Sequence, residues 1–92
     1  MILYHVTTPK KVRAYRESGQ INPPVRGFDT VAAALFWAAK TGRGVILKIE
    51  PGCENTYMLP DHHNQYGRAF WTSESIKSWM SECHIRDEEG RQ

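Results

Sequence analysis

Hydrophobic and polar residues alternate in three stretches of the chain, and this alternation predicts strands. Residues 2–6 alternate, which indicates a first strand with one buried face. Residues 45–50 show the clearest pattern, with Val45, Leu47 and Ile49 on one side of the strand. Residues 56–59 form a shorter third candidate.

Two stretches with helical spacing lie between capping signals. The first helix is expected to begin at Thr8 and Pro9, a typical N-cap and first-turn pair, and to end at Gly19. Val12 and Tyr15 share one face of it, and basic residues dominate the rest. This pattern predicts a short surface helix with a basic outer face.

The second helix is expected to begin after Asp29 and Thr30 and to end at Gly42. Its apolar residues cover so much of the surface that we expect little of it to face water, with Leu35 and Trp37 in the core. The apolar residues are Val31, Ala34, Leu35, Phe36, Trp37 and Ala38.

The other segments carry weaker signals. Residues 21–28 contain two consecutive prolines and are expected to be extended, and residues 60–68 are polar and predict an exposed loop. Residues 75–85 fit a helix through Ile76, Trp79, Met80 and Cys83, or a strand through Trp79, Ser81, Cys83 and Ile85. The strand is favoured because three serines weaken a helix.

These elements predict one small α/β (α+β) domain over residues 1–92, with a mixed or antiparallel sheet and two helices. Residues 86–92 are expected to form a frayed, charged tail. The 92 residues are 40% hydrophobic and 24% charged, which is typical of globular chains and excludes disorder as the main state.

Composition also bears on the cellular compartment of the protein and on the kinds of partner that it could bind. The longest uncharged apolar run, residues 31–39, is too short to cross a bilayer, and the first residues do not resemble an export signal. Cys53 and Cys83 are too few for a disulfide framework. We therefore expect a soluble, cytoplasmic protein with free thiols and no membrane partner. The net charge of +2 mildly favours anionic ligands, but the basic residues are scattered and do not form the dense stripe of a dedicated nucleic-acid binder.

The first candidate site is Tyr4-His5-Val6-Thr7, at the end of the opening strand. The imidazole of His5 could hold a ribose hydroxyl or act as an acid or base, because its usual pKa lies near neutrality. The alternative is a partly buried histidine whose hydrogen bond goes to a backbone group.

The second candidate site is the run from Pro24 to Phe28. Arg26 presents a fork of donors that suits phosphate, Gly27 permits close backbone approach, and Phe28 offers a ring for stacking. The alternative is a surface arginine, a turn glycine and a core phenylalanine.

The third candidate site is the loop from Asp61 to Arg68 and the aromatic pair that follows it. A row of hydrogen-bonding side chains on a loop indicates a recognition surface, with a solvated connection as the alternative. The expected ligand-binding residues are His62, His63, Asn64, Tyr66, Arg68 and Trp71. The possible zinc ligands Cys53, Asp61, His62, His63, Cys83 and His84 show no metal-binding spacing, so no metal is expected.

Glu74 is the fourth candidate, as a carboxylate that could hold ribose hydroxyls or stabilise a developing cation. Its alternative is an ordinary exposed glutamate. No second acidic residue stands in a glycosidase relation to it, and no serine lies in a nucleophile elbow.

Four of these stretches together resemble the core of ADP-ribosyltransferase-like domains. They are Leu3-Tyr4-His5-Val6-Thr7, the Gly27–Thr30 turn, the Ala-rich aromatic helix to Ala39, and the strand at residues 44–49, with a weaker match at residues 73–76. The Tyr-His-Val-Thr start and the Asp-His-His-Asn loop are also similar to small proteins of phages and mobile elements.

The resemblance implies roles for individual residues. His5 would hold the nicotinamide ribose of NAD, Thr7 would lie beside the nicotinamide, Phe36 or Trp37 would be the packing aromatic, and Glu74 would be the catalytic carboxylate. Val6 stands where the family's histidine form has glycine.

Three hypotheses follow. The first is an ADP-ribosyltransferase-like protein that binds NAD or an ADP-ribose derivative and modifies a macromolecule, with His5 and Glu74 as catalytic residues and Arg26 on the pyrophosphate. The second is a non-catalytic binder that sequesters a nucleotide immune signal, as a phage anti-defence protein would. The third, and least favoured, is binding of RNA or DNA through the basic first helix.

Overall fold

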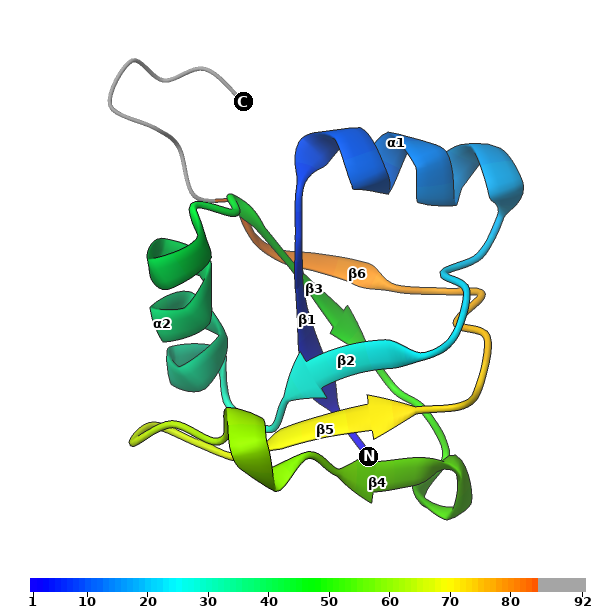
Figure 1. The fold of residues 1–92 in the computed structure, drawn as a ribbon. Helices are drawn as coiled ribbons and strands as arrows, with labels where there is room; N and C mark the ends of the chain where they lie inside the picture. Colours follow the sequence, from blue (N-terminus) through cyan, green and yellow to red (C-terminus); the bar gives the residue numbers. More distant parts are fainter. Residues whose placement is uncertain (85–92) are drawn as a thin grey trace.

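The computed structural model describes residues 1–84, and the tail expected at residues 86–92 lies outside them. Six strands form one sheet in the order β4-β5-β2-β1-β3-β6, and every pair of neighbours is antiparallel (Figure 1). The elements are β1 (Leu3–Thr7), α1 (Pro9–Ser18), β2 (Val25–Phe28), α2 (Val31–Thr41), β3 (Val45–Ile49), β4 (Thr56–Met58), β5 (Ala69–Thr72) and β6 (Met80–His84). The predicted α+β class with two helices is confirmed.

Both helices begin and end where the sequence predicts. The hydroxyl of Thr8 accepts a hydrogen bond from the amide of Lys11, and that of Thr30 accepts one from the amide of Ala33. Each helix ends on a glycine in the left-handed region, Gly19 with φ 81° and Gly42 with φ 73°. Side chains other than glycine rarely adopt that conformation, which explains both helix ends.

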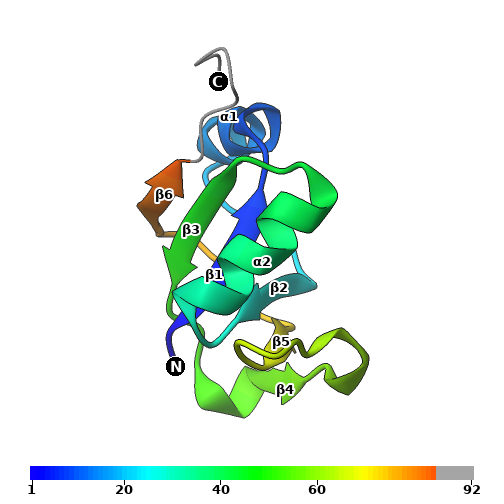
Figure 2. The same cartoon turned by 90° about the vertical axis from the view of Figure 1, so that its left-hand side faces the viewer.

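The sheet is buried on both faces, so two clusters of apolar side chains form the core. One face carries Leu3 and Leu47, against which Val12 of α1 packs, and the other carries Val6 and Ile46. Helix α2 lies across this second face, over β1 and β3 (Figure 2). The predicted alternation of β3 is confirmed, but the half-buried first strand is wrong, because Leu3 and Val6 lie on opposite faces of β1 and both are buried.

The expectation that α2 is buried on nearly all sides is also wrong. Leu35 is 37% exposed and Phe36 is 40% exposed, whereas Ala33, Ala34 and Ala38 are buried. The helix lies on the outside of the sheet, so only one stripe of it contacts the core. Leu35 is therefore not a core residue.

The C-terminal half of the chain contains one strand that the sequence did not predict and two that it did. Strand β5 lies where the sequence predicts none, because the pair Phe70-Trp71 directly follows the polar loop at residues 60–68. Strand β4 at Thr56–Met58 and the favoured strand at β6 are confirmed, with β6 paired to β3. No helix within residues 1–84 is long and apolar enough to span a membrane.

The sheet opens between β1 and β2, and this opening positions the candidate site. β1 pairs with β3 along its whole length but with β2 only at Tyr4 and Phe28. The strands approach closely there, since a Cβ on Gly27 would lie 3.0 Å from the Cβ of Leu3. From this contact they diverge toward α1 (Figure 1).

Candidate ligand-binding site

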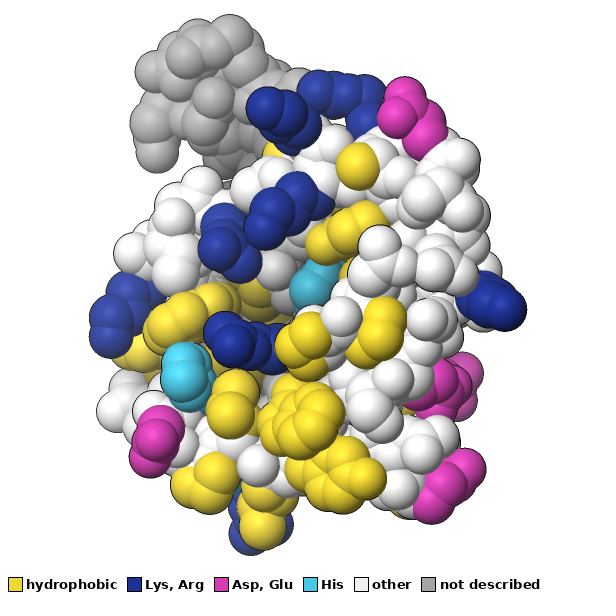
Figure 3. All heavy atoms as spheres, turned by 45° about the vertical axis from the view of Figure 1, so that its right-hand side comes forward, with side chains coloured by type: hydrophobic (Ala, Val, Ile, Leu, Met, Phe, Trp, Pro, Cys, Tyr) yellow, Lys and Arg dark blue, Asp and Glu magenta, His cyan; other side chains and the backbone are white. Residues whose placement is uncertain are grey.

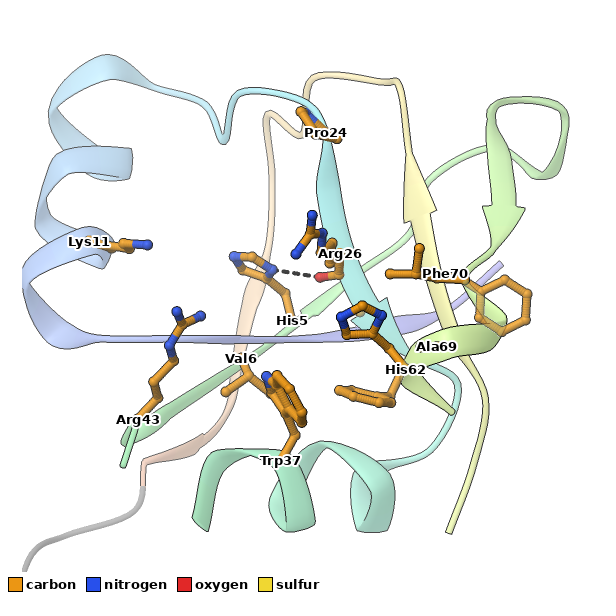
Figure 4. A pocket seen from close by; sticks show the side chains of 13 residues that line it. His5, Val6, Lys11, Pro24, Arg26, Trp37, Arg43, His62, Ala69 and Phe70 are labelled. Atoms are coloured by element: carbon orange, nitrogen blue, oxygen red, sulfur yellow. Dashed lines mark hydrogen bonds between the residues drawn. The ribbon is translucent and has the colours of Figure 1, made fainter. Parts of the chain in front are cut away.

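A cavity of about 310 Å³ occupies the opening between β1 and β2 (Figure 4). Its walls come from both helices, from three strands and from the loop after β4. The lining residues are His5, Val6, Lys11, Pro24, Arg26, Gly27, Phe28, Trp37, Arg43, Leu59, His62, Ala69 and Phe70. The volume lies at the lower end of the range for sites that hold a small organic ligand.

Three cationic side chains line the cavity from three different parts of the fold. Lys11 comes from α1, Arg26 from β2, and Arg43 from the turn between α2 and β3 (Figure 4). None of the described residues that line the cavity is acidic. In the space-filling view, Lys and Arg side chains flank a hollow that contains a histidine (Figure 3). The cavity is therefore positively charged and suited to an anion.

Aromatic rings form the wall on the side of α2. The ring of Trp37 lies 6.2 Å from that of Phe28 and 5.9 Å from that of His62, measured between centroids. The ammonium of Lys40 lies 6.0 Å from the centroid of Trp37. Such a wall offers dispersion contacts and stacking to a flat apolar group.

His5 crosses the opening and is hydrogen-bonded through both ring nitrogens. Its Nδ1 lies 2.7 Å from the carbonyl oxygen of Arg26 and its Nε2 lies 3.1 Å from the hydroxyl of Tyr15. A carbonyl only accepts, so Nδ1 carries the proton and donates it, and in the neutral ring Nε2 accepts from Tyr15. The Tyr15 oxygen lies 3.2 Å from the hydroxyl of Thr7, which extends the chain of hydrogen bonds.

The surroundings of His5 keep it neutral. Burial lowers the pKa of His5 below its usual 6.5, and the nearby charges of Lys11 and Arg43 lower it further, against the opposing effect of the bond to the Arg26 carbonyl. At pH 7 the imidazole therefore braces β1 against β2 as an uncharged group. The sequence left open whether His5 binds a ligand or a backbone group. In the structure its Nδ1 is bonded to the backbone carbonyl of Arg26.

His62 has an unsatisfied polar atom beside the cavity. Its Nδ1 is buried and has no hydrogen-bond partner among the described residues. A buried polar atom without a hydrogen-bond partner lowers the stability of the fold. If the imidazole ring rotated so that this nitrogen faced the cavity, a bound group would supply the missing hydrogen bond. Of the expected loop residues, His62 is the one that lines the cavity.

The other loop residues hold the loop against the start of α2. Nδ1 of His63 accepts a hydrogen bond from the amide of Ala69, at 2.8 Å, and the side-chain amide of Asn64 donates to the carbonyl of Ala33 at 3.2 Å. The backbone of Arg68 exchanges hydrogen bonds with Asp29. These contacts give His63 and Asn64 a structural role.

Two more of the expected site residues, Tyr66 and Trp71, each pack against another aromatic ring. The ring of Tyr66 lies 5.5 Å from that of Phe36 on the exposed side of α2, and the ring of Trp71 lies 4.8 Å from that of Tyr57. Trp37, and not Phe36, is therefore the aromatic of α2 that reaches the cavity.

Tyr4, Thr7 and Glu74 lie apart from the cavity walls. Tyr4 is partly buried and packs against the core cluster under α2, and Thr7 is fully buried. Glu74 accepts hydrogen bonds from the amide of Gly52 at 3.0 Å and from the side chain of Asn55 at 3.4 Å, and it lines a different hollow. The structure thus brings together His5, Arg26, Gly27, Phe28 and His62 but not the pair His5 and Glu74.

Sequence reasoning missed Lys11 and Arg43 as site residues. Lys11 is one of several basic residues on the first helix, and Arg43 is a single cation in a distant turn. They meet because β3 runs antiparallel to β1, which places the turn before Val45 beside the end of β1 at Thr7. The one available signal was Arg43 between two glycines, since glycines flank residues at tight turns.

The described residues hold no group of three or more His, Cys, Asp or Glu side chains that could bind a metal ion. Cys53 is an exposed free thiol. The side chains of Cys83 and His84, which were considered as ligands, lie outside the described part of the structure.

The fold and the cavity define a small α+β domain with an antiparallel six-stranded sheet that opens beside its central strand. No protein-family model, curated protein or solved structure matches the chain.

Proposed function

We propose that this protein binds a phosphorylated nucleotide of the ADP-ribose type in the cavity between β1 and β2. The observation that carries the proposal is the convergence of Lys11, Arg26 and Arg43 on one cavity whose described lining is otherwise apolar, aromatic or histidine. Like charges repel each other, and a bound anion would offset this cost.

The cations suit phosphate groups. Arg26 and Arg43 can each pair with two oxygens of a phosphate through their planar guanidinium groups, and Lys11 adds a mobile ammonium. Such charge-assisted hydrogen bonds are about twice as strong as neutral ones. They would hold the phosphate groups of the ligand along the wall formed by α1, β2 and the turn before β3.

The apolar wall suits a ring. Trp37 lies on the side of α2, across the cavity from Lys11 (Figure 4), and its ring lies 6.2 Å from that of Phe28. A base stacked on an aromatic side chain gains about 1–3 kcal/mol. A phosphate at one end and a ring at the other is the arrangement of a nucleotide.

The contacts of His5 and Glu74 favour binding over transfer. Both nitrogens of His5 are already hydrogen-bonded within the protein, and the carboxylate of Glu74 is bonded to the turn at Gly52. Tight binding needs phosphate pairing and stacking but no complementarity to a transition state. A protein with these properties would lower the free concentration of a nucleotide signal, as an anti-defence protein of a phage would.

Isothermal titration calorimetry with ADP-ribose and adenosine 5′-monophosphate tests the proposal. The Arg26→Ala, Arg43→Ala and Lys11→Ala variants should each bind about tenfold to a hundredfold more weakly, because each loses charge-assisted hydrogen bonds. Lys10→Ala is the matched control, since Lys10 is an exposed neighbour on the same helix that does not line the cavity. Equal binding by all four variants would place the site elsewhere.

ADP-ribosyl transfer is the second candidate. The observation that favours it is that His5, Gly27 and Trp37, which belong to the stretches that resemble transferases, all line the cavity. Incubation with labelled NAD and a cell lysate separates the two functions. Labelled protein or released nicotinamide would indicate transfer, whereas intact ligand recovered after heat denaturation would indicate binding alone.

A further inference from the structure

A row of three side chains crosses the sheet from the cavity to its edge. Arg26 of β2 is the direct partner of Trp71 on β5, and Trp71 is the direct partner of Tyr57 on β4. Directly opposed residues of antiparallel strands project from the same face of the sheet. Arg26 therefore belongs both to the cavity and to an aromatic surface beside it, formed by Trp71 and Tyr57.

The aromatic surface is open to solvent. Tyr57 is 47% exposed on an edge strand of three residues, and its ring lies 4.8 Å from that of Trp71 with 35° between the ring planes. Large hydrophobic side chains gather beside the hollow in the space-filling view (Figure 3). The two rings are in contact at the surface at a tilt, and together they form a platform where a further flat ring can stack on the exposed ring of Tyr57.

Sheet stability alone does not explain the position of Arg26. Aromatic pairs across strands stabilise a sheet, and Tyr57 and Trp71 do so whatever else they bind. A guanidinium between this platform and the cavity adds charge complementarity to a phosphate that lies between two rings. The cavity, at about 310 Å³, is also at the lower limit for one small ligand, so a second nucleoside would have to lie outside it.

We propose that the platform of Trp71 and Tyr57 is a second ring-binding subsite, so that the ligand is a dinucleotide with two rings joined through phosphate. One ring lies in the cavity against Trp37, the linking phosphate lies at Arg26, and the other ring stacks on the platform. This inference rests on the proposed function and narrows the ligand class from one ring to two.

Binding of one-ring and two-ring probes tests the subsite. Adenosine 5′-monophosphate is the one-ring probe, and NAD and the 5′-phosphorylated dinucleotide pApA are the two-ring probes. The unaltered protein should bind at least one two-ring probe about tenfold more tightly, which lies within the range for stacking a base on an aromatic side chain. A gain for NAD alone or for pApA alone identifies which phosphate linkage fits.

Two variants and a control assign the gain to the platform. Tyr57→Ala and Trp71→Leu should abolish the advantage of the two-ring probe and leave binding of adenosine 5′-monophosphate unchanged. Met58→Ala should change neither, because Met58 is an exposed neighbour on the same strand that projects from the opposite face. If Trp71→Leu does not fold, as judged by its circular dichroism, Tyr57→Ala at the edge strand decides.

Each other outcome overturns the inference in a distinguishable way. If adenosine 5′-monophosphate binds but no two-ring probe binds more tightly, or if Tyr57→Ala retains the advantage, the second subsite is wrong and the proposed function stands. If none of the three probes binds, both fall together.

Discussion

The protonation state and the hydrogen bonds of His5 depend on the residues around it. The residue is polar, lies in a strand and lines the cavity, yet its two nitrogens are occupied by the Arg26 carbonyl and the Tyr15 hydroxyl. Burial and the charges of Lys11 and Arg43 disfavour its protonated form. The same two cations that attract an anion to the cavity therefore hold the imidazole neutral.

The titration of His5 is the prediction at this scale. In an NMR titration, the pKa of His5 should lie below 6.5, and Lys11→Ala and Arg43→Ala should each raise it, because each removes a repelling charge. Lys10→Ala should leave it unchanged. An unaltered pKa in both cavity variants would mean that Lys11 and Arg43 do not approach the ring.

Linkage gives the sign of the accompanying change in stability. Since the pKa of His5 is lowered on folding, its contribution is retained in full above pH 6.5. As the pH falls below 6.5, the unfolded chain takes up the proton first, and the free energy of unfolding declines until the pH reaches the folded pKa. His5→Gln should lack this part of the pH dependence in urea unfolding curves.

Helix α2 shows how an element's position overrides its composition. Its sequence is apolar enough to be buried on all sides, but the helix lies on the outer side of the sheet and packs through a stripe of alanines. Leu35 and Phe36 are left at the surface, and Trp37 is left to line the cavity. The amphipathic pattern is masked because the solvent-facing positions are also apolar.

Two leucines test this account of α2. Leu47→Ala should lower the free energy of unfolding by about 2–5 kcal/mol, the usual range for a buried leucine, because Leu47 is 1% exposed. Leu35→Ala should change it by less than about 1 kcal/mol, since Leu35 is 37% exposed. Urea unfolding measures both. Equal losses would show that Leu35 is covered in solution.

At the scale of the whole molecule, the positive charges around the cavity lower the stability of the free protein and favour binding of an anion. Three cations from α1, β2 and the turn before β3 line one cavity. They are a quarter of the 12 basic residues of a chain whose net charge is only +2. Convergent charge of one sign is unfavourable without a ligand and favourable with one. Functional sites commonly carry such a cost.

The melting temperature should therefore respond in opposite ways with and without ligand. The Lys11→Ala/Arg43→Ala double variant should melt at the same or a higher temperature than the unaltered protein when no ligand is present. A ligand at 100 times its Kd adds about 2.7 kcal/mol to the unaltered protein. For a domain of this size that corresponds to a rise of roughly 10–20 °C, which the double variant should lose.

Differential scanning calorimetry with and without ADP-ribose measures these melting temperatures. A double variant that melts well below the unaltered protein without ligand would show that the two cations are structural. A full ligand-induced rise in the double variant would show that they do not contact the ligand.

The sequence by itself determined both helices, the strands β1, β3, β4 and β6, and the placement of Arg26, Gly27 and Phe28 next to a capped helix. These features depend on local physical chemistry. Threonine caps, left-handed glycines and the two-residue period of a strand act within a few residues, so they can be read along the chain.

Only the tertiary structure decided which side of each element is buried and which distant residues share a site. Lys11 and Arg43 meet because β3 returns beside β1, and His5 and Glu74 do not line the same cavity because the turn at Gly52 binds the Glu74 carboxylate. Strand β5 has the right residues for a strand, but its pairing with β2 and β4 is what makes Trp71 and Tyr57 neighbours. Contacts between residues far apart in sequence depend on strand order and register, and these are set by the packing of the whole core.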